Sequence, residues 1–532
     1  MKQDFTRREF IRASALSASA VAFGSLVKFV GAAEMGKGAA VQSGPARQVF
    51  PLNQDWRFGG RFRAAEVLKP EFDDAAFEKV TLPHCVARLS WQGWHPAEWQ
   101  DVWIYRRHFT TPKEFKNRRV FLDFDGVMNT ATPSLNGKPL PAHAGGYLPF
   151  HYEITHLLKH DNVLAMTVDA RWNNVPPDGS PQGTGKVDYL EAGGIIRPVS
   201  LRAVPQIFIS DVFAKPVAVL SQDRRVEVTC AIDAAMVPRK PVQVRVEMRD
   251  GERVMASVSQ TVKLEKIGKM EMALTLSNLG DVKLWDVDAP QLYQIVTTLV
   301  VDKEPVHDYR TRIGLREARF DVDGFFLNGK RFRLFGLDRH EIYPYAGFAM
   351  PARVMRKDAE ILRREFNCNA VRCSHYPQNE AFLDACDELG LLVWQETPGW
   401  QYIGDAAYED LVVRDVQEMV RRDRNHASII VWGVRVNESR NDVALYERTT
   451  AAAKALDDSR PTSGSMTPDS RKNWQQDWHE DVFAFDDYHA SADGTVGIDA
   501  PLPGVPYMLA EAVGQFSYGS KGFNNKYRRA GD

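Results

Sequence analysis

Residues 369–396 read NAVRCSHYPQNEAFLDACDELGLLVWQE, and this stretch sets the fold class of the C-terminal part of the chain. The apolar run at 370–374 predicts a strand, the amphipathic pattern at 380–389 predicts a helix, and the apolar run at 391–395 predicts a second strand. Strands that alternate with helices imply right-handed β–α–β units. Such units build either an open, doubly wound sheet or a closed eight-stranded barrel.

The same alternation continues on both sides of this stretch, and polar residues gather just after the predicted strands. Functional groups at successive carboxyl ends are typical of the top face of a barrel. No G-x-G-x-x-G motif follows a strand and no phosphate-binding G-x-x-x-x-G-K-[ST] motif occurs, which argues against a nucleotide-binding sheet. The strand-end residues are His340, Glu341, His375, Glu396, Asn437, Glu438, Tyr488 and Glu511.

Two strand-rich regions precede the barrel. Residues 46–205 contain short alternating strands broken by turns, with Asn136-Gly137 as a strong hairpin signal, and this pattern predicts a β jelly-roll sandwich. Residues 206–319 alternate cleanly over a length that fits an immunoglobulin-like β-sandwich. We therefore expect a multidomain protein whose third domain, residues 320–532, is a (β/α)8 TIM barrel.

Composition excludes several classes of protein. The 532 residues carry 67 Lys plus Arg against 69 Asp plus Glu, so the chain lacks the positive charge of a dedicated nucleic-acid or anionic-membrane binder. No apolar run after the N-terminus reaches the roughly 18 residues of a membrane span. The five cysteines lack metal-ligand spacing and imply neither a disulfide framework nor a zinc site. A homo-oligomer is compatible with this composition.

The N-terminus has the pattern of a targeting signal rather than of a folded domain. Residues 6–12 read TRREFIR and precede a weakly apolar stretch that ends near residue 33, which resembles a bacterial twin-arginine signal peptide. We expect residues 1–33 to be this signal and the mature protein to be periplasmic or secreted. The alternative is a cytosolic amphipathic N-terminal helix.

Two glutamates at strand ends suggest a reaction. Glu438 and Glu511 each follow an apolar run, where partial loss of solvent raises the pKa of a carboxyl group. Cleavage of a glycosidic bond needs one protonated and one ionised carboxyl group. The alternative for each glutamate taken alone is an ion-paired strand-end residue.

Longer motifs resemble those of glycoside hydrolase family 2, which contains β-galactosidases, β-glucuronidases and β-mannosidases. The resemblance covers nearly everything after the signal and follows the family's order. The matching motifs are LNG at 135–137, GGYLPF at 145–150, GGIIRP at 193–198, GFFLNGK at 324–330, GLDRHE at 336–341 and NAVRCSHYP at 369–377.

The resemblance implies a role for each candidate residue. Glu438 becomes the general acid/base, Asn437 holds the sugar 2-hydroxyl, and Glu511 becomes the nucleophile of a retaining reaction. Arg372 would lower the pKa of Glu511 by charge pairing. The remaining candidates are substrate contacts: Tyr488 as a hydrogen-bond donor to Glu511, His340 and His375 at sugar hydroxyls unless their role is structural, and Trp400, Tyr402, Trp474 and Trp478 as stacking platforms unless they are core.

Three departures from the family pattern qualify these expectations. Alanine follows Glu511 where many members have an aromatic residue. Residues 396–398 read ETP, with Pro398 in place of a histidine ligand found in magnesium-dependent members, so we expect no metal and no cofactor, with magnesium as the alternative. From residue 325 only about 210 residues remain, against roughly 250 for a full barrel. With seven predicted strands, at 332–337, 369–374, 391–396, 428–433, 461–465, 482–487 and 507–511, we expect a barrel truncated at its C-terminal end.

The sequence thus predicts a retaining exo-β-glycosidase that acts on terminal β-linked sugars of an oligosaccharide or polysaccharide-derived substrate. β-Galactosides are the leading substrates. The alternatives are β-glucuronidase or β-mannosidase specificity, or a catalytically inactive carbohydrate-binding fragment.

Overall fold

The computed structural model describes residues 48–90, 95–177, 187, 189–466, 477–487 and 502–512. Residues 1–37 and 38–532 form two separate units, and the first unit lies outside the described residues. The predicted signal at residues 1–33 is therefore outside them, as are Tyr488 and Trp474.

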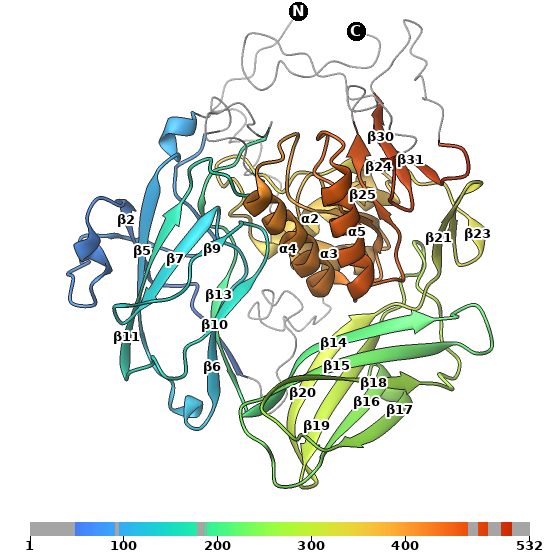
Figure 1. Cartoon of the computed structure of the whole chain (residues 1–532), viewed down its shortest axis with the longest axis horizontal. Helices are drawn as coiled ribbons and strands as arrows, with labels where there is room; N and C mark the ends of the chain where they lie inside the picture. The colour runs from blue at the N-terminus through green and yellow to red at the C-terminus, as the bar shows by residue number, and fades with distance from the viewer. Residues whose placement is uncertain are drawn as a thin grey trace, which may run out of the picture. The chain divides into compact units, whose positions relative to one another are not determined.

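The first domain is an antiparallel β-sandwich of two sheets, with strand orders β1-β13-β6-β10 and β3-β2-β5-β11-β7-β8, as predicted (Figure 1). Its core is lined by alternate residues of the facing strands, such as Trp56, Tyr105 and Leu122. The elements are β1 (Gln48–Pro51), β2 (Trp56–Arg61), η1 (Ala65–Leu68), β3 (Glu78–Val80), β4 (His84–Cys85), η2 (Pro96–Glu98), β5 (Val102–Thr110), η3 (Lys113–Phe115), β6 (Arg119–Phe124), β7 (Thr130–Leu135), β8 (Lys138–Pro139), β9 (His143–Ala144), β10 (Phe150–Glu153), β11 (Asp161–Asp169), β12 (Gly194–Ile195) and β13 (Val199–Val204).

The hairpin predicted at Asn136-Gly137 joins β7 to β8. Leu135 pairs with Lys138, which leaves two residues in the turn, and both have positive φ, 55° at Asn136 and 79° at Gly137. Asparagine and glycine adopt this backbone conformation at low cost. The Asn136 side chain also donates to the Leu157 carbonyl at 2.9 Å, which ties the turn to the rest of the sandwich.

The second domain is a smaller sandwich of two antiparallel sheets, β14-β15-β18 and β17-β16-β19-β20. Every second residue of β15 is buried, which is the period-2 pattern that the sequence shows. The strands are β14 (Ile207–Val217), β15 (Arg225–Ala234), β16 (Val242–Asp250), β17 (Arg253–Val262), β18 (Gly268–Leu276), β19 (Tyr293–Val301) and β20 (Glu304–Ile313).

The third domain begins with a small antiparallel sheet, β21-β22-β23, and continues with parallel strands that alternate with helices. The strands β24 to β28 form one parallel sheet and β29 to β31 another, while α2 packs on α3 and α4 on α5 (Figure 1). The elements are β21 (Ala318–Asp321), β22 (Gly324–Leu327), β23 (Lys330–Arg331), β24 (Gly336–Asp338), α2 (Ala352–Glu360), η4 (Ile361–Glu365), β25 (Ala370–Arg372), α3 (Glu380–Leu389), β26 (Leu392–Glu396), α4 (Ala406–Asp423), β27 (Ile429–Gly433), α5 (Val443–Leu456), β28 (Thr462–Ser463), β29 (Ser465–Met466), β30 (Phe483–Asp487) and β31 (Tyr507–Ala512).

Three local features differ from the sequence prediction. The first barrel strand is Gly336–Asp338 rather than 332–337. The apolar pattern of residues 353–366 predicts a single α-helix, but the α-helix ends at Glu360 and continues as one π-helical turn. The strand predicted at 461–465 is divided at Gly464 into β28, which pairs with β27, and β29, which pairs with β30, and the Arg435 side chain occupies the space that a Cβ at Gly464 would need. The predicted C-terminal truncation stays a prediction.

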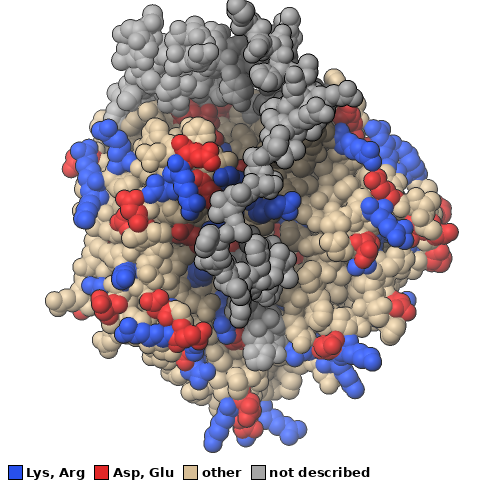
Figure 2. Space-filling view, turned by 180° about the vertical axis from the view of Figure 1, so that it is seen from behind, with Lys and Arg blue, Asp and Glu red and all other residues tan. Residues whose placement is uncertain are grey.

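The surface carries both signs of charge. On the face drawn in Figure 2, basic and acidic side chains are interspersed over the described residues. None of the helices in the described ranges has the length and apolar character needed to cross a lipid bilayer.

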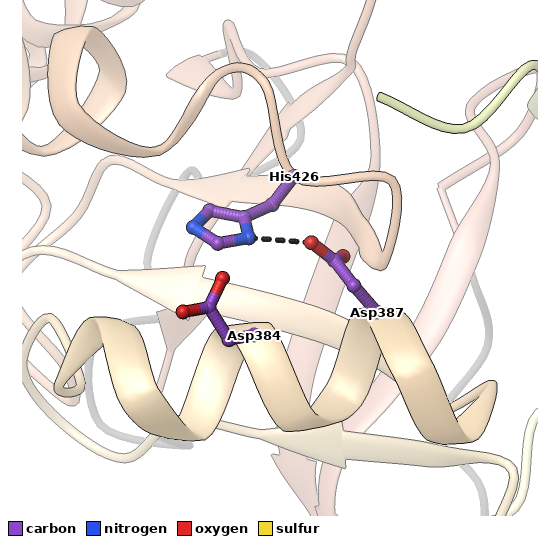
Figure 3. Close-up of side chains that lie close together, drawn as sticks. All are labelled: Asp384, Asp387 and His426. Carbon is purple, nitrogen blue, oxygen red and sulfur yellow. Dashed lines mark hydrogen bonds and ion pairs between the residues drawn. The ribbon is translucent and has the colours of Figure 1, made fainter. Parts of the chain in front are cut away.

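A charged cluster links the second domain to the barrel. His426 Nδ1 lies 2.7 Å from Asp387 on α3, with Asp384 of the same helix nearby (Figure 3). Arg312 of β20 donates to Asp384 and, at 2.5 Å, to Glu388. Although burial opposes the charge on His426, the Asp387 carboxylate raises the pKa of His426 to about 9.

We predict that His426→Gln destabilises the protein in a pH-dependent way. A histidine whose pKa rises from 6.5 to about 9 on folding stabilises fully below pH 6.5, and this stabilisation is lost as the pH rises through 9. The loss in free energy of unfolding is therefore expected to be on the order of 3 kcal/mol at pH 6 and much smaller at pH 9.5. Urea denaturation at both values measures it, with His160→Gln, whose side chain is 82% exposed, as the control. Equal losses at both pH values would mean that the ion pair does not form.

Candidate active site

The carboxyl ends of the parallel strands place five polar side chains together. Arg372 ends β25, Glu396 ends β26, Asn437 follows β27, Asp486 lies near the end of β30, and Glu511 lies near the end of β31. Parallel strands end at the same edge of a sheet, so residues far apart in the sequence meet there. These residues span positions 372–511 of the chain.

The Arg372 guanidinium is the centre of this group. Its Nε and Nη2 donate to the two oxygens of Glu396 at 2.9 and 3.0 Å, in the bidentate geometry that arginine favours. A second bond from Nη2 reaches Asn437 Oδ1 at 2.6 Å. Nη1 donates to Glu511 at 2.8 Å and to Asp338 at 3.2 Å. All five N–H groups of Arg372 are therefore used.

Arg372 stays charged although it is buried. Burial lowers its pKa, but the carboxylates around it, Glu396 first, hold the pKa of Arg372 well above its usual value. Four carboxyl groups lie within 4 Å of this one guanidinium, those of Asp338, Glu396, Asp486 and Glu511. The site therefore has more acidic groups than its single arginine neutralises.

Glu438 lies in a different setting from Glu511. Its carboxylate accepts a hydrogen bond from the neutral amide Nε2 of Gln401 at 3.0 Å. The residue is half-buried and has φ 51°, so the backbone turns sharply at this point. Both glutamates act on the buried Asp486, because each raises its pKa by charge repulsion.

The loop after β26 pairs with the loop that carries Glu438. Trp400 forms a β-bridge with Asn437, and Gln401 N–H donates to the Asn437 carbonyl at 2.7 Å. Trp400 itself is half-buried. These bonds bring Trp400 and Gln401 beside the pair Asn437-Glu438.

Two histidines complete the group. His375 Nε2 lies 3.6 Å from Glu511, and its Nδ1 lies 3.5 Å from Glu396. The ring of His340 meets that of His375 edge to face, with centroids 5.3 Å apart, and His340 Nδ1 lies 3.2 Å from the Tyr376 hydroxyl. Burial, aided by His375, lowers the pKa of His340 to about 3, so this ring is neutral at physiological pH.

The structure therefore brings together Arg372, His375, Asn437 and Glu511, with His340, Glu438 and Trp400 around them. Trp478 behaves as a core residue, since its ring centroid lies 4.8 Å from that of Phe483 and its ring also packs on the Arg435 guanidinium. Sequence reasoning missed Asp338, Asp486 and Gln401. Of these, Asp338 and Asp486 carry a strand-end signal, whereas Gln401 lies in a loop.

Acidic side chains at two places are candidate metal ligands: Glu396, and the group Asp384, Asp387 and His426. Both oxygens of Glu396 accept from Arg372, so this carboxylate does not suit a divalent cation. Among the described residues, Asp384, Asp387 and His426 lie close enough together to hold a metal ion. However, Arg312 already neutralises Asp384, and a protonated His426 offers no lone pair. Both sets are thus paired with charged side chains of the protein itself.

We predict that Arg372→Met strongly destabilises the barrel. The substitution leaves the buried carboxyl group of Glu396 without a positive partner, which costs about 3–5 kcal/mol of free energy of unfolding. Urea denaturation followed by tryptophan fluorescence measures this loss. Arg253→Met on an exposed strand position is the matched control and should change little. A loss below about 1 kcal/mol would show that Glu396 does not depend on this charge.

Three family models match the chain in order. The model "Glycosyl hydrolase 2 galactose-binding domain-like" matches residues 92–189, "Glycosyl hydrolases family 2" matches 207–316, and "Glycosyl hydrolases family 2, TIM barrel domain" matches 320–471. These matches fall on the two sandwiches and the barrel.

Individual relatives agree with this assignment. A β-galactosidase of Thermoanaerobacterium thermosulfurigenes is 35% identical over 91% of this chain and 67% of its own length. A second, from Thermoanaerobacter pseudethanolicus, is also 35% identical, over 91% of this chain and 63% of its own length. The solved structure of a Bacteroides uniformis β-glucuronidase superposes with a TM-score of 0.75 at 25% identity, covering 84% of this chain and 55% of that one. The chain therefore spans about half to two-thirds of the length of its relatives, and it belongs to glycosyl hydrolase family 2.

Proposed function

We propose that this protein is a retaining exo-β-glycosidase that hydrolyses terminal β-linked sugars, with β-galactosides as its preferred substrates. Glu511 acts as the nucleophile and Glu438 as the general acid/base. The observation that carries this proposal is the different environment of the two carboxyl groups. Glu511 accepts from the Arg372 cation at 2.8 Å, whereas Glu438 accepts from the neutral amide of Gln401 at 3.0 Å.

This difference suits the two steps of the reaction. A nearby cation favours the ionised form of a carboxyl group, which the nucleophile needs. In the first step, Glu511 attacks the anomeric carbon while Glu438 gives its proton to the leaving oxygen. In the second step, Glu438 takes a proton from water, the water oxygen displaces Glu511, and the sugar leaves with its original configuration.

The other residues orient the sugar in this proposal. Asn437 Oδ1 accepts from Arg372 at 2.6 Å, and its Nδ2 lies 3.4 Å from His375, which fixes the amide for contact with the 2-hydroxyl. On one side of the proposed sugar site the neutral His340 provides a polar group, and the half-buried Trp400 provides an aromatic ring. Tyr488 keeps its proposed role as a donor to Glu511, on sequence grounds alone.

The balance of charge favours a neutral sugar. Around Arg372, the carboxylates of Glu396 and Glu511 already outnumber the single arginine, so a negatively charged uronic acid meets repulsion there. The β-galactosidase relatives at 35% identity support the same substrate class. The second candidate is a β-glucuronidase, which similarity to the Bacteroides uniformis structure favours. β-Mannosidase activity or sugar binding without catalysis are the further alternatives.

We also propose that the protein is exported to the periplasm or the medium by the twin-arginine route. This proposal depends on the arginine pair at residues 7–8 and the weakly apolar stretch that follows it.

We predict that Glu511→Gln lowers kcat by roughly a thousandfold or more, about 4 kcal/mol of transition-state stabilisation, because an amide cannot attack the anomeric carbon. A panel of nitrophenyl β-glycosides measures turnover and identifies the preferred sugar. The circular dichroism spectrum of the variant should match that of the wild type. Unchanged activity would refute the role of Glu511, while a wild-type protein that binds sugars but turns over none would support the binding alternative.

We predict that azide restores turnover to Glu438→Ala. The small anion enters the space of the lost carboxylate and attacks the glycosyl-enzyme, so the product should be a β-glycosyl azide. Product analysis by NMR gives the configuration. The same treatment of Glu511→Gln should give no azide product by this route, and failure of azide with Glu438→Ala would argue that another residue is the acid/base.

A further inference from the structure

Asp486 is a buried acid that the proposed reaction does not use. It lies on β30 and pairs in register with Glu511 on the neighbouring strand β31. Its side chain is 0% exposed. A fully buried carboxylate is costly unless hydrogen bonds and opposite charge compensate it.

The nearest cation does not supply those hydrogen bonds. Arg372 Nη1 lies 3.7 Å from Asp486, beyond hydrogen-bond distance, and all five N–H groups of Arg372 are used by other acceptors. Those acceptors are Glu396, Asn437, Glu511 and Asp338. Asp486 is therefore attracted by the positive charge of Arg372, which it shares with the other acids, but it accepts no hydrogen bond from Arg372.

Neither carboxyl oxygen of Asp486 has a hydrogen bond of ordinary geometry within the described residues. The Ser465 hydroxyl on β29 is close enough to favour the charged form slightly. Burial dominates this balance and raises the pKa of Asp486 well above its usual value, with further increases from Glu511 and Glu438. Asp338, Glu396 and His375 are the other titratable groups around the same guanidinium.

Asp338 is subject to the same shortage of positive charge. Its carboxyl group shares the Arg372 Nη1 donor with Glu511, at 3.2 Å from Asp338 and 2.8 Å from Glu511. Burial and the neighbouring acids raise the pKa of Asp338 well above its usual value, against the effect of Arg372. One guanidinium is thus shared among four carboxyl groups.

We propose that Asp486 is a neutral carboxylic acid in the folded enzyme and acts as a positioning residue for Glu511. If Asp486 were ionised, it would compete with Glu511 for Arg372 and would add a second anion beside the first. As a neutral acid it fills the space next to Glu511 and leaves Glu511 as the anion that Arg372 holds. The positioning role rests on the proposed function, whereas the protonation state does not.

The protonation state is tested by the pH dependence of stability. A carboxyl group with a raised pKa in the folded state makes folding less favourable as the pH rises from its unfolded pKa, about 4, towards its folded pKa. Asp486→Asn has the shape of the neutral acid and cannot ionise. The unfolding temperature of this variant should therefore exceed that of the wild type by a margin that widens from pH 5 to pH 8. Asp302→Asn, with 62% exposure, is the control and should show no such widening.

An unfolding temperature of Asp486→Asn that falls below that of the wild type increasingly with pH, or a constant difference, would overturn the proposal. Infrared spectra of wild-type protein with 13C-labelled aspartate provide an independent measurement that needs no folded variant. A protonated carboxyl band that shifts with the label is expected at pH 7 and should lose intensity in Asp486→Asn but not in Asp302→Asn. A labelled spectrum with carboxylate bands alone would also overturn the proposal.

The positioning role is tested by turnover of the best nitrophenyl glycoside. Asp486→Lys, which brings a second cation beside Arg372, should lower kcat by more than about a hundredfold at unchanged KM, and the neutral Asp486→Asn should lower kcat less than Asp486→Lys does. A hundredfold loss in Asp486→Asn would instead assign Asp486 as a required anion. If the wild type has no glycosidase activity, the proposed function fails, while the stability and infrared measurements still decide the state of Asp486.

Discussion

The Arg372 guanidinium is the one charge on which the organisation of the barrel end depends. It is buried, and moving a charged group out of water is expensive unless every donor finds an acceptor. Its acceptors come from β24, β26, β31 and the loop after β27. Satisfying one arginine therefore requires these four segments to end at the same place. The geometry of the candidate active site at this end of the barrel thus depends on the same five hydrogen bonds.

Much of the fold could be predicted because local signals agree with the final structure. The helix at Glu380–Leu389 was predicted with its correct ends, since Asn379 caps its first turn and Gly390 takes the left-handed conformation after its last. The break at Gly464 and the π-helical turn at Ile361–Glu365 could not be predicted in the same way. At the break the chain changes its pairing partner from β27 to β30, and such long-range contacts leave no local pattern.

The candidate site was predictable to the extent that strand ends reveal it. Arg372, Asn437 and Glu511 meet because parallel strands bring their carboxyl ends together, and the family resemblance gave them roles. Asp338 and Asp486 were missed for a different reason. Their importance comes from the number of acidic side chains that surround Arg372. That number is known only from the three-dimensional arrangement of the strands, and the sequence does not show it. The Asp384, Asp387 and His426 cluster was missed likewise, because it joins a helix to a loop about 40 positions later.

The shortage of positive charge also connects three properties that otherwise look separate. Because both oxygens of Glu396 accept from Arg372, the charge of that carboxylate is paired with the arginine. The remaining N–H groups of Arg372 donate to Glu511, Asp338 and Asn437. Because none of them is available to the buried Asp486, we infer that this carboxyl group keeps its proton. Because the acids outnumber the cation, an incoming sugar that carries its own carboxylate is disfavoured relative to a neutral one. A second cation in this cluster would change the last two together: it would favour the ionised form of Asp486 and reduce the repulsion of an anionic sugar. The proposed preference for neutral sugars is therefore a consequence of how one guanidinium is shared.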